Sequence, residues 1–152
     1  MYDIKFLPLE EWEDAIGLAY KTFLEYDAPD FAPEGIQHFR EFVSDNHLRR
    51  MFESGELQVI GAYDDKLIGM IALKNNSHIS LLFVDGAYHR HGIGSTLLCE
   101  IMDYARNKLK QEYLTVNSSP FAVDFYHNMG FENLKSEIVS EGIRYTPMKY
   151  ML

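Results

Sequence analysis

The fold is decided by the stretch Leu81-Leu-Phe-Val-Asp-Gly-Ala-Tyr-His-Arg-His-Gly-Ile-Gly-Ser-Thr-Leu-Leu98. Residues 79–84, which lead into it, are nearly all apolar, as is typical of a strand buried on both faces. Gly92 and Gly94 then turn the chain into a helix expected over residues 92–110. The first amides of a helix have no internal partners, and with the helix dipole they favour a bound anion. The stretch therefore predicts a strand–loop–helix unit that holds a phosphate group, with Arg90 as an additional cation.

Other glycine-rich phosphate loops fit this stretch poorly. A P-loop needs Gly-Lys-Ser/Thr after four spacer residues, and that ending is absent. A dinucleotide-binding loop needs a third glycine where Leu97 stands, and several further strand–helix units after it. An ordinary strand–turn–helix, with glycines that serve only the turn, stays open on this segment alone.

In the rest of the chain, segments whose apolar residues have the spacing of a strand alternate with segments that have the spacing of a helix. They predict one domain over residues 1–152, an α/β fold with a mixed sheet, helices on both faces and the order β-α-α-β-β-β-α-β-α-β-β. The expected strands are residues 2–7, 57–63, 67–73, 79–84, 113–117, 131–139 and 143–151. The expected helices are residues 10–26, 92–110 and 121–129, with a further helix that begins at Pro33 and, alone or followed by a short third helix, ends near Phe52.

The composition of the chain indicates which binding partners and which cellular location are to be expected. The 23 acidic residues outnumber the 14 basic ones for a net charge of −9, so the chain is a poor candidate for binding nucleic acid, which needs a basic footprint. This acidity suits a cationic small partner, although it also serves solubility alone. With one cysteine, no signal-peptide pattern and no apolar run of about 20 residues, we expect a cytoplasmic protein without membrane spans.

Neither metal chemistry nor a cysteine nucleophile is expected. The six histidines include no His-Glu-x-x-His pair, and the single cysteine excludes a Cys-x-x-Cys pair. Cys99 falls within the helix of residues 92–110 and has no local histidine, so we expect a structural thiol.

A second cluster indicates a family. Asn117-Ser-Ser-Pro-Phe-Ala-Val-Asp-Phe-Tyr-His-Asn-Met-Gly-Phe131 follows the strand of residues 113–117. A glycine loop of the form Arg/Gln-x-x-Gly-x-Gly/Ala, a strand ending in Asn, and Ala-x-x-Phe-Tyr-x-x-x-Gly-Phe together resemble the GNAT superfamily of N-acetyltransferases. The likeness extends from about Ile79 to the end of the chain. His89 stands where the family commonly has Gln or Arg, and Gly86 stands in place of a proline, which predicts a looser loop.

The resemblance implies a mostly antiparallel sheet with a parallel, splayed pair of strands, and acetyl-CoA as cofactor. In the family, the strand matching residues 79–84 carries a bulge and pairs with the pantetheine arm, while the amides of residues 90–95 hold the pyrophosphate. His89 would offer a hydrogen bond to phosphate. The implied cofactor-binding residues are Phe83, Val84, His89, Arg90, His91, Gly92, Ile93, Gly94, Ser95, Asn117 and Phe125.

The resemblance also implies direct attack of a neutral amine on the thioester. Tyr126 matches the tyrosine that protonates the departing thiolate, and Asn117 would lie near the thioester. The base stays unidentified; His78, Glu25 and Asp27 are candidates, although residues in such positions are more often plain surface residues. The acceptor wall would come from the acidic and aromatic residues 25–34, which favours a small cationic amine or a peptide amine. The candidate substrate residues are Glu25, Tyr26, Asp27, Phe31 and His78.

Two functions of other classes stay open on sequence. One is a non-catalytic acyl-CoA-binding sensor or interaction module, from which turnover with any acceptor amine would distinguish an enzyme. The other is a structural homodimer domain, which would not bind coenzyme A. Homodimers are common in such folds, although no sequence feature demonstrates one.

Overall fold

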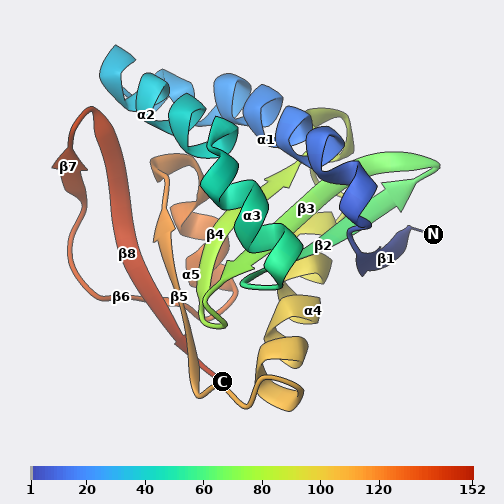
Figure 1. Ribbon diagram of the computed structural model, residues 1–152. Coiled ribbons are helices and arrows are strands. Elements are labelled where there is room, and N and C mark those ends of the chain that lie inside the picture. The colour runs from blue at the N-terminus through green and yellow to red at the C-terminus, as the bar shows by residue number, and fades with distance from the viewer. Residues whose placement is uncertain (1) are drawn as a thin grey trace.

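The computed structural model describes residues 2–152 as five α-helices and eight strands in one chain, joined in part by short 3-10 helices (Figure 1). The helices are α1 Trp12–Tyr26, α2 Pro33–Ser44, α3 Asn46–Ser54, α4 Ile93–Asn107 and α5 Val123–Asn128. The strands are β1 Asp3–Phe6, β2 Leu57–Asp64, β3 Lys66–Lys74, β4 His78–Val84, β5 Tyr113–Ser118, β6 Glu132–Asn133, β7 Ile138–Ser140 and β8 Ile143–Met151. The predicted mixed α/β fold is confirmed.

The strands form one mixed sheet in the order β1-β2-β3-β4-β5-β8-β6, with β7 paired to β8. Every pairing is antiparallel except β4 with β5. That parallel pair is short, because only His78↔Thr115 and Ile79↔Val116 are in register before the two strands separate. The sheet therefore contains the expected splayed pair, which opens toward the carboxyl ends of β4 and β5.

Helices cover both faces of the sheet, as Figure 1 shows. On one face α1, α2 and α3 bury a cluster that includes Trp12 and Phe52. On the other, α4 and α5 bury a second cluster around Leu97, Ile101 and Tyr126. Burial of two apolar layers on one sheet is the main stabilising term for a fold of this kind, and it fixes β4 as a strand covered on both sides.

Strand β4 carries the expected bulge. Ala72 pairs with Leu81 and Leu73 pairs with Ile79, so Ser80 is an extra residue without a partner on β3. A bulge bends its strand and locally interrupts the ladder. Here it lies beside the point where β4 leaves β5, so the bend accompanies the splay.

Three sequence expectations are refined by the structure. Asp45 ends α2 and its carboxylate accepts the His47 amide at 2.8 Å, so a separate α3 follows. Residues 131–139 are two short strands, because the segment of residues 134–137 between them is exposed and has no buried face to pair against the sheet. Cys99 is exposed, not buried as a structural thiol, because α4 turns it to the outer face with Asp103.

Two absences hold for residues 2–152. No helix there is both long enough and apolar enough to cross a membrane. No group of histidine, cysteine, aspartate and glutamate side chains there has the geometry of a metal site.

Candidate active site

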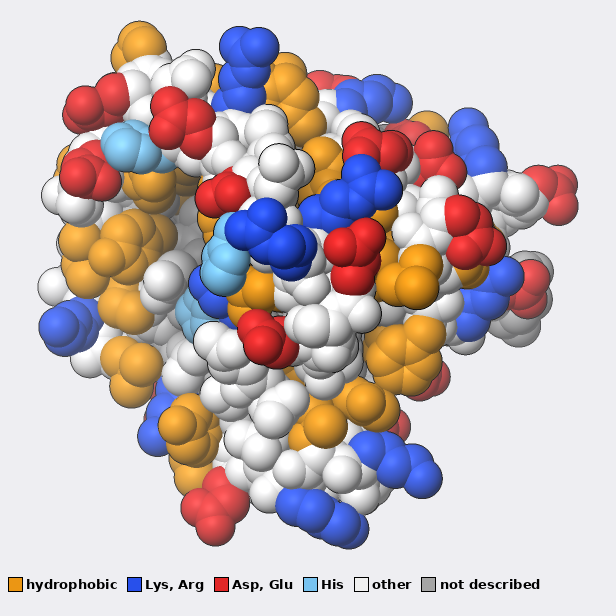
Figure 2. Space-filling view, in the orientation of Figure 1, with side chains coloured by type: hydrophobic (Ala, Val, Ile, Leu, Met, Phe, Trp, Pro, Cys, Tyr) orange, Lys and Arg blue, Asp and Glu red, His pale blue; other side chains and the backbone are white. Residues whose placement is uncertain are grey.

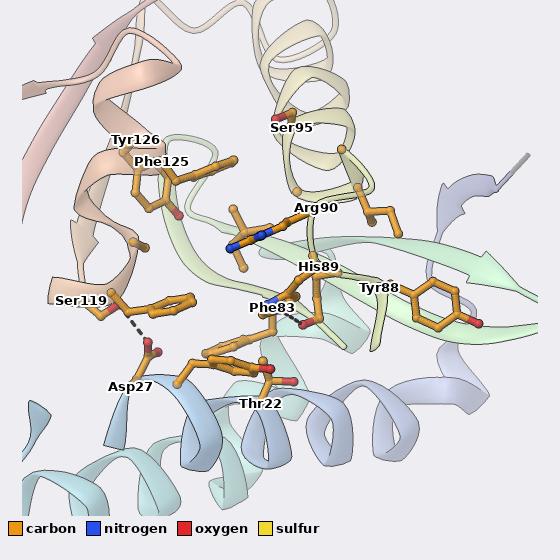
Figure 3. Close-up of a pocket in the computed structure, with 18 residues that line it drawn as sticks. Thr22, Asp27, Phe83, Tyr88, His89, Arg90, Ser95, Ser119, Phe125 and Tyr126 are labelled. Carbon is orange, nitrogen blue, oxygen red and sulfur yellow. Dashed lines mark hydrogen bonds between the residues drawn. The ribbon is translucent and has the colours of Figure 1, made fainter. Parts of the chain in front are cut away.

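A cavity of about 690 Å³ opens where the glycine loop meets the splayed strands (Figure 3). Its walls come from the end of β4, the loop before α4, the first turn of α4, the end of α1 and helix α5. The structure brings most of the sequence candidates together here. Those that line the cavity are Tyr26, Asp27, Phe83, Val84, His89, Arg90, Gly92, Ile93, Gly94, Ser95, Phe125 and Tyr126.

The amino end of α4 lines this cavity. Gly92 caps the helix in the left-handed region, at φ 76°, and no side chain caps or neutralises the first turn. Arg90 is also left-handed, at φ 67°, which is uncommon for a residue with a side chain. Within residues 2–152 its guanidinium has no carboxylate partner. Free amides and a free guanidinium therefore face the same space, as a diphosphate requires.

His89 has a different hydrogen-bond partner from the expected phosphate. Its Nε2 lies 2.8 Å from the carbonyl oxygen of Val84, and because that oxygen only accepts, Nε2 carries the proton. Its ring packs against Tyr26 and Phe121, with centroids 4.6 and 6.3 Å away. His89 thus fastens the loop to the end of β4 and occupies a backbone acceptor that we expected to pair with pantetheine.

Gly86 does not loosen the loop. A side chain there would collide with the hydroxyl of Tyr26, so the glycine permits a close approach between the loop and the end of α1. Next to it, the Asp85 carboxylate accepts the Ala87 amide at 3.0 Å, and the Asp85 amide donates to the carbonyl of Ile68 at 2.8 Å. The loop is held on both sides despite lacking the proline.

Tyr126 lies at the inner end of the cavity. It is 4% exposed, and its ring packs edge-on against Phe125 and Phe131. Figure 3 shows its hydroxyl pointing into the cavity. Burial, reinforced by the nearby charge of Asp27, raises the pKa of the Tyr126 phenol well above its usual value. The phenol therefore keeps its proton at neutral pH and is available to donate it.

Asp27 faces Tyr126 from the end of α1. Burial raises the pKa of its carboxyl from 3.8 to about 6, an effect opposed by a hydrogen bond from Ser119 and increased by Asp30. The Ser119 hydroxyl donates to the carboxylate at 2.9 Å (Figure 3). Asp27 is thus ionised at pH 7 but titrates close enough to neutrality to accept a proton.

A second cavity of about 530 Å³ lies on the α1–α2 side of the splay. It shares Asp27, Ser119 and Tyr126 with the first cavity, so the two spaces meet at these side chains. Figure 2 shows the surface hollowed between the helices and the β8 side of the molecule, with histidine and basic side chains at the hollow. Of the sequence candidates, Phe31, His78 and Asn117 line this second cavity and not the first.

Two sequence candidates lie outside both cavities. Glu25 is exposed on the outer side of α1. His91 turns away, and its Nδ1 lies 2.9 Å from the Tyr2 hydroxyl. Sequence reasoning missed Ser119 and Lys74, which line the second cavity. Ser119 directly follows the Asn117-Ser pair of the second motif and could have been found, whereas nothing in the sequence singles out Lys74.

Comparisons with known proteins agree with this geometry. A family model described as an acetyltransferase (GNAT) domain matches residues 27–152. Among solved structures, a GCN5-related N-acetyltransferase from Rhodopseudomonas palustris has TM-score 0.84 at 20% identity, covering 99% of this chain and 95% of that one. The PaiA N-acetyltransferase from Thermoplasma acidophilum, solved with coenzyme A, has TM-score 0.82 at 23% identity, covering 100% and 99%.

A more distant likeness is to the spermidine N-acetyltransferase SpeG from Vibrio cholerae, with TM-score 0.66 at 14% identity, covering 99% and 93%. No curated protein sequence matches the chain. At these identities the solved structures establish the fold, and the family model establishes the family. The chain belongs to the GNAT acetyltransferase family, and acetyl-CoA is its acyl donor.

Proposed function

We propose that this enzyme moves the acetyl group of acetyl-CoA to a primary amine of a small acceptor by direct attack. The observation that carries the proposal is the meeting of two cavities at Asp27 and Tyr126. One cavity is lined by the uncapped first turn of α4, and the other reaches the same side chains from the α1–α2 side of the splay. An acyl donor and an amine that enter from the two sides would meet at a carboxylate and a phenol.

The residues of the first cavity fit the donor. The amides of Gly92, Gly94 and Ser95, with the Arg90 guanidinium, would hold the pyrophosphate. Phe83 and Val84 line the cavity where β5 has left β4, so their backbone would lie beside the pantetheine arm. When bound there, acetyl-CoA supplies a thioester carbonyl that an amine attacks.

Asp27 is the base in this proposal. A protonated amine cannot attack, so it must lose a proton first, and a carboxylate with a pKa of about 6 is ionised at pH 7 and close enough in basicity to share that proton. The Ser119 hydroxyl fixes the orientation of the carboxylate. Asp27 would therefore both attract the ammonium group and take its proton.

Tyr126 is the acid. Its raised pKa keeps the phenol protonated, and its hydroxyl would donate that proton to the coenzyme A sulfur as the thiolate leaves. The Asp27 carboxylate accepts its hydrogen bond from Ser119 and not from Tyr126, so the phenol proton would be available to turn toward the sulfur. Asn117 lines the acceptor side of the splay, and in the proposal its amide lies near the thioester.

Replacing Tyr126 by Phe tests the assignment. We expect kcat to fall by about 100-fold or more, the usual contribution of a general acid, while the Kd for acetyl-CoA stays within about twofold. Thiol release measures the first quantity and calorimetry the second. Unchanged turnover would remove Tyr126 from the chemistry. If wild-type protein binds acetyl-CoA but releases no thiol with any amine tested, a non-catalytic sensor would be favoured.

A further inference from the structure

The walls of the acceptor-side cavity are aromatic. Phe23 and Phe39 are stacked, with ring centroids 3.9 Å apart and planes 9° apart, and Phe39 meets Phe83 edge-on at 5.8 Å. Phe31 packs edge-on against Phe23 at 5.4 Å, and Phe42 also lines the space. A cavity of about 530 Å³ with such walls favours a flat or bulky apolar body, since apolar surface buried against rings is the main source of affinity.

The charges along this cavity are arranged asymmetrically. Asp27 is the only carboxylate that lines it, among residues 2–152. Lys74 and His78, which are paired across β3 and β4, line its opposite end. Burial, followed by the charge of Lys74, lowers the pKa of His78, so that end presents a neutral imidazole beside an ammonium group.

Among residues 2–152, Lys74 is the cationic side chain of the cavity that has no acidic partner, whereas His38 lies 3.7 Å from the Glu141 carboxylate. Arg144 lies 3.3 Å from Glu137 and 3.7 Å from Asp30, so acidic neighbours already compensate its charge. Within the described residues 2–152, Lys74 forms no ion pair. Lys74 is a partly buried residue, and an ammonium group without a carboxylate partner favours an anionic group on whatever enters.

The strand register gives the spacing between the two charges. His78 pairs with Thr115, and Ser119, which binds Asp27, follows four residues later along the chain. At about 3.3 Å for each extended residue, the two ends lie roughly 13 Å apart along the cleft. A polyamine would place an ammonium group near Lys74, where it would be repelled.

We infer that the acceptor is an amine with an aromatic or bulky apolar body and a carboxylate at its far end, and not a polyamine. The amine would lie at Asp27, the body between the phenylalanine rings, and the carboxylate at Lys74 with His78. This inference rests on the proposed acetyl transfer and names the substrate class of the same site. It replaces the sequence-based expectation of a cationic acceptor, because Glu25 faces away from the cleft and Asp30 is close to Arg144.

A matched acceptor series tests the inference. The compounds 4-(2-aminoethyl)benzoate, 4-(2-aminoethyl)benzamide and 4-(2-aminoethyl)benzamidine share one shape and one amine but carry a negative, neutral or positive far end. We expect kcat/KM from thiol release to fall in that order, with at least tenfold between the first and last, as for a charge-assisted contact. Spermidine should be poorer than the benzoate. Preference for the benzamidine or for spermidine would overturn the inference and leave the acetyl transfer intact.

Charge reversal at Lys74 sharpens the test. Lys74→Glu should reverse the preference between benzoate and benzamidine, while Lys108→Glu, at an exposed position beyond α4, makes the same change in net charge and should not. An unchanged order in Lys74→Glu would contradict the inference. If no amine is acetylated, the proposed function fails. Calorimetry of the benzoate and the benzamidine on coenzyme A-loaded protein then tests the inference separately. Tighter binding of the benzoate would support it, and tighter binding of the benzamidine would overturn it.

Discussion

The buried carboxylate of Asp27 should cost the folded protein stability. Its pKa rises from 3.8 to about 6, mainly through burial, which means that the folded state binds this proton more tightly than the unfolded chain does. Below about pH 4 both states are protonated and no penalty exists. Between pH 4 and 6 the penalty grows, and above pH 6 it is complete. At about 1.4 kcal/mol for each tenfold change in proton affinity, it reaches about 3 kcal/mol.

Asp27→Asn removes the charge while keeping the shape of the side chain. We expect its free energy of unfolding at pH 8 to exceed that of wild type by up to about 3 kcal/mol, and the difference to vanish near pH 4. Chemical denaturation at pH 4, 6 and 8 measures it. Glu25→Gln, an exposed carboxylate on the same helix, is the matched control and should change stability by less than about 0.5 kcal/mol.

The same substitution should remove activity. Wild-type kcat/KM should fall as pH drops through about 6, because protonated Asp27 no longer accepts a proton. In Asp27→Asn, kcat/KM at pH 8 should be lower than in wild type by about 100-fold or more, and it should not fall further as the pH drops through about 6. An Asn variant that is less stable than wild type at pH 8, or one that keeps both its activity and the acidic fall, would refute the role given to Asp27.

Two further changes probe the surroundings of the site. Ser119→Ala removes the hydrogen bond that lowers the pKa of Asp27. The fall of kcat/KM at acidic pH should therefore move to higher pH. An unmoved profile would show that Ser119 does not influence the titration of Asp27. Gly35→Ala would place a methyl group against the backbone of Gly142 and push the β7–β8 turn away from α2. We expect urea unfolding to show a loss of about 1–3 kcal/mol in stability, and the KM for the acceptor to rise. Unchanged values would show that the turn moves freely.

The sequence was informative where the fold is built locally. The apolar run before the glycine loop and the helical stripe after it predicted β4 and α4, because each is read from neighbouring residues. Two motifs placed Tyr126 and the loop, and the structure puts both on one cavity. Residues 131–139 failed as a single strand because β6 pairs with the far end of β8, at Met148 and Lys149, while β7 pairs with its near end across the turn, and the residues between β6 and β7 stay exposed.

Contacts between distant residues could not be read from the sequence. Ser119 and Asp27 are 92 residues apart, and only the packing of α1 against the splay brings them together. In the sequence alone, Asp27 and Glu25 are two similar carboxylates at the end of a helix. Only the contact with Ser119 and the burial around it distinguish Asp27. The bond of His89 to the Val84 carbonyl is local, but its ring packs against Tyr26 and Phe121, which are distant in the sequence, and those contacts could not be predicted.

Thermal unfolding with and without acetyl-CoA, in wild type and in Gly94→Val, tests most directly whether the cavity at α4 is the donor site. A side chain at Gly94 extends toward Phe125 and into the cavity without a backbone collision, so the variant should fold. At a concentration 100 times its Kd, the ligand should stabilise wild type by about 2.7 kcal/mol and raise Tm by roughly 5–10 °C. The account predicts this rise in wild type and little or none in Gly94→Val. No rise in wild type, or an equal rise in both proteins, would contradict it.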